Sequence, residues 1–87
     1  MSMNTEDTRF EVRRHLAANP ASSLYIDDIA HRLGRKGLET NAADVLAACV
    51  FLAGLTPPQV ILTSVSLGSG KRAQITSAGV LAYERNE

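Results

Sequence analysis

The first pattern of apolar positions along the chain predicts a helix over residues 5–19. Val12, Leu16 and Ala17 recur at helical spacing, with Phe10 at the edge of the same face. Thr5 is a candidate N-cap because acidic residues follow it, and Pro20 ends the pattern because the residue before a proline disfavours helical angles. We therefore expect a disordered tail at residues 1–4 and a single domain over residues 5–87.

A short extended segment at residues 24–26 precedes a second helical pattern over residues 28–33. Asp27 is the candidate cap of this helix, and Gly34 is the candidate C′ residue just past its end. The inward-facing positions of the helix are Ile29, Ala30 and Leu33. Residues 35–38 then form a basic turn, because Arg35 and Lys36 stand between two helical patterns.

The third helical pattern runs to Ala53, with Thr40 or Asn41 as its cap and Gly54 as its stop. At about 100° per residue the core face holds Ala42, Val45, Cys49 and Leu52. The opposite face holds Ala43, Asp44, Ala47, Val50 and Phe51. A helix that is apolar almost all round is normally buried on more than one side. Either a partner or a second copy covers the face of Ala43, Ala47, Val50 and Phe51, or the first or last helix covers it within one monomer.

The last third of the chain predicts a β-hairpin followed by a helix. Two stretches rich in β-branched and apolar residues flank the residues Gly68-Ser69-Gly70-Lys71, and residues 60–67 and 71–76 are expected to form the two strands. A fourth helix is expected over residues 77–84, with Thr76 as its cap. Gly79 lets the first turn of this helix approach its neighbour closely. The chain is thus expected to be mainly α with a β-hairpin, an α+β fold.

This order of elements resembles the bacterial winged helix-turn-helix superfamily. Three stretches carry the resemblance: residues 25–33 as the first helix of the helix-turn-helix, 44–55 as its recognition helix, and 74–83 as the step after the wing. The resemblance implies three helices, a two-stranded wing, a C-terminal helix and a role in DNA binding. The sequence departs from the pattern in two places. The turn at residues 34–39 is longer than in a minimal helix-turn-helix, and the recognition helix carries no basic residue.

Charge bears on that implied function. Nine basic residues balance nine acidic ones, so any positive surface that binds phosphates must be local. The resemblance places Lys71 and Arg72 on the wing, Arg35 and Lys36 on phosphates, and Thr40 and Asn41 at the major groove. The expected function is that of a DNA-binding transcriptional regulator or accessory factor acting on double-stranded DNA as a dimer. The alternative is a protein-interaction or dimerisation module that has the fold but does not bind DNA.

The sequence offers little support for a nucleotide-binding, metal-binding or catalytic site. Residues 68–71 lack the earlier glycine and the following Ser or Thr of a phosphate-binding P-loop. No zinc site is predicted, because the candidate ligands His15, His31 and Cys49 are too few and too scattered. Cys49 lies in an apolar run, so we expect it to be a buried side chain. We expect no enzyme activity, no cofactor, no membrane segment and a cytoplasmic location.

Overall fold

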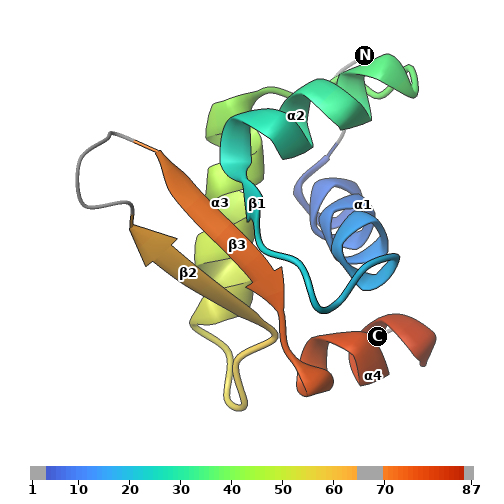
Figure 1. Cartoon of the computed structure of the whole chain (residues 1–87). Coiled ribbons are helices and arrows are strands. Elements are labelled where there is room, and N and C mark those ends of the chain that lie inside the picture. The colour runs from blue at the N-terminus through green and yellow to red at the C-terminus, as the bar shows by residue number, and fades with distance from the viewer. Residues whose placement is uncertain (1–3, 65–69, 86–87) are drawn as a thin grey trace.

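The computed structural model describes residues 4–64 and 70–85 of the chain. These residues form four helices and one three-stranded antiparallel sheet, an α+β arrangement. The helices are α1 (Thr5–Ala17), α2 (Ile26–Arg35), α3 (Ala42–Ala53) and α4 (Ser77–Glu84). The strands are β1 (Leu24–Tyr25), β2 (Val60–Ser64) and β3 (Lys71–Ile75), and their order in the sheet is β1-β3-β2. Figure 1 shows α3 lying behind the sheet and α4 at the end where β3 finishes.

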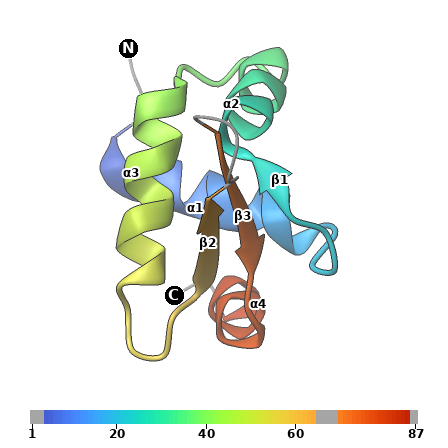
Figure 2. The same cartoon turned by 60° about the vertical axis from the view of Figure 1, so that its left-hand side comes forward.

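The core lies where α1, α2 and α3 meet the inner face of the sheet. Alternate strand residues point into it, so that Val60 on β2 and both Ala73 and Ile75 on β3 are buried. The helices contribute the remaining large buried side chains, which are Val12, Leu16, Ile26, Ile29, Leu33, Val45, Cys49 and Leu52. This cluster confirms the expected inward faces, with Ala48 as an additional buried residue on α3 and Ala42 at its half-buried edge. Figure 2 shows α3 on one side of the sheet and α1 behind it.

Helix α1 begins at Thr5, as the sequence pattern predicts, but its cap is Asn4 and not Thr5, and it ends two residues earlier than predicted. The side chain of Asn4, placed in the tail by that prediction, accepts a hydrogen bond of 2.8 Å from the Asp7 amide and is the N-cap. At the other end Ala18 is the C-cap, and the Asn19 amide donates to the Leu16 carbonyl. The chain therefore turns before it reaches Pro20, and Asn19 is outside the helix.

Helix α2 corrects two further predictions. It starts directly after the strand pairing of Tyr25, which is the N-cap and makes no side-chain cap bond, so Asp27 is a first-turn residue and not the cap. It also runs through Gly34, and the left-handed C′ residue is Gly37 at φ 87°. The amides of Gly37 and Leu38 donate to the carbonyls of Gly34 and Leu33, the pair of bonds that closes a Schellman motif.

Helices α3 and α4 begin as the sequence predicts. Asn41, and not Thr40, caps α3 by accepting a hydrogen bond of 2.9 Å from the Asp44 amide. Thr76 caps α4 by accepting one of 3.1 Å from the Gly79 amide, so β3 ends one residue before the predicted limit. A Cβ atom on Gly79 would overlap the Gln59 carbonyl oxygen and the Ile75 side chain, which explains the glycine. Strand β2 is described up to Ser64, and the predicted strand residues 65–67 lie outside the described part of the chain.

Candidate nucleic-acid interface

A hollow of about 280 Å³ marks the place where the first turn of α2, the middle of α3 and the start of β3 meet. Figure 1 shows the end of β2 and the start of β3 reaching past the helices at this point. The residues that line the hollow are Tyr25, Ile26, Asp27, Asp28, Leu46, Gly70 and Lys71. The arrangement brings one of the expected DNA-contacting residues, Lys71, beside both the second and the third helix.

Lys71 and Arg72 are both exposed, and the strand directs them to opposite faces of the sheet. Lys71 shares its face with buried Ala73 and therefore points toward the hollow. Arg72 lies opposite Tyr25 in the β1–β3 register, and its guanidinium carbon is 4.9 Å from the centre of the Tyr25 ring. That distance is within the range of a cation–π contact, which holds the Arg72 charge over β1.

Two carboxylates line the same hollow as Lys71. Asp27 and Asp28 stand in the first turn of α2, where the positive end of the helix dipole favours them. Among the described residues that line the hollow, Lys71 is the single cation against these two carboxylates. The hollow is therefore not a strongly positive site, and the positive charge of this region lies on β3 alone.

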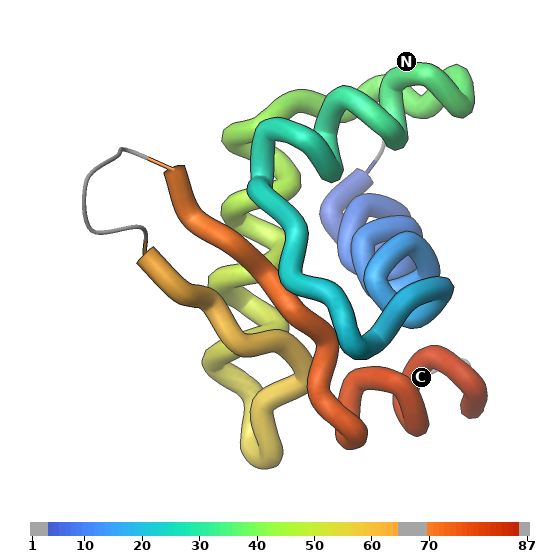
Figure 3. The backbone as a smooth tube through the Cα atoms, in the orientation of Figure 1, coloured from blue at the N-terminus to red at the C-terminus, as the bar shows by residue number. Residues whose placement is uncertain are grey.

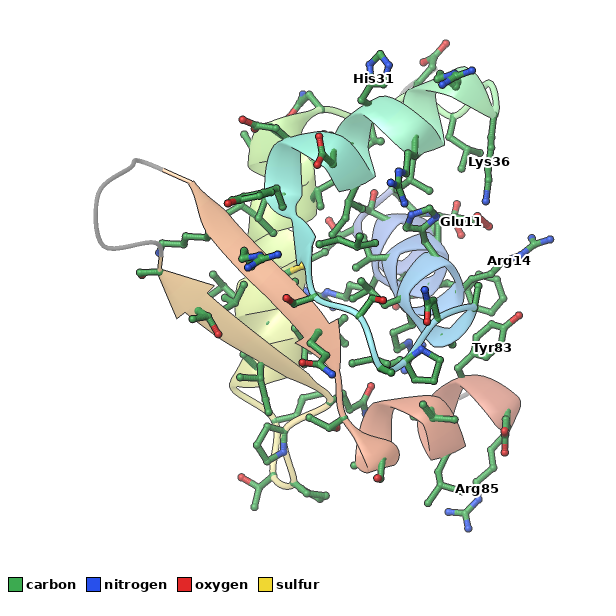
Figure 4. All side chains as sticks on the ribbon, viewed as in Figure 1. Glu11, Arg14, His31, Lys36, Tyr83 and Arg85 are labelled. Atoms are coloured by element: carbon green, nitrogen blue, oxygen red, sulfur yellow. The ribbon has the colours of Figure 1, made fainter. Side chains whose placement is uncertain are left out.

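Arg35 and Lys36 are at the other end of α2, away from Lys71 and Arg72. A ten-residue helix is about 15 Å long, and the first turn of α2 adjoins the hollow whereas Arg35 is its last residue. Lys36 points from there toward Glu11 of α1 (Figure 4). The pKa of His15 on α1 is lowered by burial and by the positive charges of Lys36 and Arg32. The two predicted basic pairs therefore do not form one surface.

The expected major-groove residues, Thr40 and Asn41, are at the start of α3. Figure 3 shows the segment between α2 and α3 turning back along α2 to reach this point. The Asn41 side-chain oxygen is used as the helix cap. Thr40 is half-buried, and its Oγ1 has no hydrogen-bond partner among the described residues. Neither oxygen is presented freely to a ligand.

The outward face of α3 is open. All five residues predicted to lie opposite the core are exposed, with Val50 at 53% and Phe51 at 43% of their full accessible surface. Helix α1 reaches this face only at one edge, where the Arg9 guanidinium carbon lies 3.3 Å from the centre of the Phe51 ring. Sequence reasoning missed Arg9, since no pattern along the chain relates it to Phe51.

The remaining reactive groups do not gather into a site. In residues 4–64 and 70–85 no three His, Cys, Asp or Glu side chains are placed to hold a metal ion. Burial raises the pKa of the Cys49 thiol to about 12. No helix within the described ranges has the length and apolar character needed to cross a membrane. Comparisons of the chain with protein-family models, with curated proteins and with solved structures found no match.

Proposed function

We propose that this chain is a winged-helix protein that binds double-stranded DNA through the start of β3. The element order and the sheet order β1-β3-β2 support the proposal, because a winged helix likewise has a pair of helices followed by a hairpin. The observation that carries it is the exposure of both Lys71 and Arg72, on the two faces of the sheet, at the start of β3. Their charges are available to DNA phosphates or to the edge of a minor groove.

In this proposal the protein contacts the DNA backbone and not the base edges in the major groove. Base reading needs hydrogen-bonding side chains such as Arg, Lys, Asn or Gln on the recognition helix. The outward face of α3 offers the apolar Ala43, Ala47, Val50 and Phe51, together with the carboxylate of Asp44. That carboxylate would repel phosphates. The protein then acts as an accessory or architectural DNA-binding factor, with weak dependence on base sequence.

The test is the affinity for a random-sequence duplex, measured by fluorescence anisotropy at low salt. We expect micromolar binding by the parent protein, and binding weaker by at least about tenfold after Lys71→Ala with Arg72→Ala, because phosphate contacts supply most non-specific affinity. The matched control is Arg14→Ala with Arg85→Ala. It removes the same charge from exposed residues on the side of the molecule away from the start of β3 (Figure 4).

Two results would overturn the proposal. One is the absence of any binding by the parent protein at low salt. The other is an equal loss of affinity in the control variant, since that would show an effect of net charge and not of a local surface.

A second candidate function, a protein-interaction or dimerisation module, is favoured by the exposure of Val50 and Phe51. Large exposed apolar side chains that adjoin one another usually mark interaction sites on soluble domains. Its surface consists of Ala43, Ala47, Val50 and Phe51 on α3. The two candidates use different residues, so substitutions on β3 and on α3 separate them.

A further inference from the structure

The open face of α3 has a narrow central strip and two distinct flanks. Ala43, Ala47, Val50 and Gly54 follow one another at spacings of four, three and four residues, so they form a line along the helix. Leu46 lies on the flank toward the hollow and the β2–β3 hairpin. Phe51 lies on the flank toward α1. The strip is made mostly of small side chains, which permits another helix to approach closely.

The flank toward α1 carries opposite charges at its two ends. Asp44 is exposed in the first turn of α3, seven residues before Phe51 and hence about 10.5 Å away along the helix. At the Phe51 end the Arg9 guanidinium lies over the ring, in a hollow that Glu6, Asp7 and Arg13 also line. The Nε atom of Arg9 is buried and has no hydrogen-bond partner among the described residues. On this flank the Asp44 carboxylate and the Arg9 guanidinium therefore lie at opposite ends.

We propose that two copies of the chain pair through α3 in an antiparallel, two-fold symmetric contact, with Asp44 of each copy beside Arg9 of the other. In a face-to-face antiparallel pair, a two-fold axis perpendicular to both helices brings the same flank of each copy together and reverses its ends. The Asp44 end of one copy thereby meets the Phe51 end of its partner. The small side chains of the strip meet at the centre, and the opposed helix dipoles favour this direction.

The same symmetry places both β2–β3 hairpins on one side of the pair. The hairpin lies beyond the Leu46 flank of α3, and the two-fold operation keeps that flank on the same side in both copies (Figure 2). The pair then presents Lys71 and Arg72 twice, which raises the affinity for one long duplex without any new contact. The pairing itself does not rest on DNA binding, because it is measured without DNA.

The first test is sedimentation equilibrium of the parent protein over a range of concentrations, beside two glutamate variants. Ala47→Glu places a charge at the centre of the strip and is expected to raise the dimer dissociation constant at least about tenfold, since two carboxylates would meet across the axis. Ala21→Glu is the matched control at an exposed position between α1 and β1, and it should leave the dissociation constant unchanged. Circular dichroism verifies that both variants are folded. A parent protein that stays monomeric throughout, or a dimer that Ala47→Glu leaves intact, overturns the proposal.

A charge exchange tests the direction of the pair. Arg9→Asp and Asp44→Arg each place like charges together twice per dimer, so each single variant should dissociate about tenfold more readily. The double variant restores opposite charges and should regain most of the parent affinity. If the double variant loses as much dimer affinity as the two single variants together, the result would contradict the contact between Asp44 and Arg9. DNA affinity is a separate readout, so failure of the pairing and failure of DNA binding are distinguishable.

Discussion

The guanidinium of Arg9 stacks on the ring of Phe51, with its carbon 3.3 Å from the ring centre, and this contact marks the limit of what α1 covers on α3. Beyond it, Ala43, Ala47 and Val50 remain exposed. The exposed face of α3 is therefore apolar except for Asp44. The positive charge closest to it on the hairpin side is on β3. The two proposals therefore concern two different surfaces, α3 for the pairing of copies and β3 for contact with DNA.

Substitution of Gly79 by alanine is expected to destabilise the fold by about 1–3 kcal/mol. The added Cβ would overlap the Gln59 carbonyl oxygen and the Ile75 side chain, at the point where α4 packs against the chain that enters β2. Gly34→Ala is the control, because nothing lies within 4 Å of its Cβ position and it stands inside α2. That variant should be more stable by about 0.5–1 kcal/mol, the usual difference between alanine and glycine in a helix. Urea unfolding of both variants measures the difference, and equal stabilities would contradict the packing described for Gly79.

Acid should weaken the fold through His15. Its folded-state pKa lies below the ordinary value of 6.5, first because of burial and then because of Lys36 and Arg32. The unfolded chain therefore binds the proton more readily than the folded one, so the contribution of His15 to stability is complete above pH 6.5 and is lost as the pH falls through the folded pKa. The free energy of unfolding, measured by urea at several pH values from 7.5 downward, should fall less steeply in His15→Gln than in the parent protein. Parallel pH profiles would argue against this role of His15.

Cys49 should be unreactive in the folded protein. Its thiol is fully buried, and with a pKa of about 12 only roughly one molecule in ten thousand carries the thiolate at pH 8. A chromogenic disulfide reagent should therefore label the native protein at the rate of global unfolding, and label the guanidinium-denatured chain within the mixing time. Rapid labelling of the native protein would show that α3 opens far more readily than a core helix.

The sequence predicts those elements whose signals are local. The Thr76 cap with Gly79 three residues later places α4 at the observed bounds, and the spacing of apolar residues identifies both the core and the open face of α3. The limits of α2 are not local, because strand pairing of Tyr25 starts the helix and a left-handed Gly37 ends it. Gly34 resembles a helix stop in the sequence just as well as Gly37 does.

The same distinction between local and non-local signals applies to the candidate sites. The position of Val50 and Phe51 opposite the core face follows from helix geometry, whereas their exposure depends on how α1 and α4 pack. The adjacency of Lys71 and Arg72 is evident in the sequence. The separation of Arg35 from Lys71 depends on the length and direction of α2. The sequence pattern predicts a helix that is too short. The stacking of Arg9 on Phe51 joins residues that are far apart in sequence and depends on how α1 packs on α3.

The central claim is that Lys71 and Arg72 neutralise DNA phosphates, and the salt dependence of duplex binding tests it most directly. Each neutralised phosphate contributes about −0.9 to the slope of the logarithm of the association constant against the logarithm of salt concentration. A pair of chains with two such cations each predicts a slope of about −3.6, which should approach zero after Lys71→Ala with Arg72→Ala. A slope that is unchanged in that double variant, or a duplex affinity that does not depend on salt, would contradict the account.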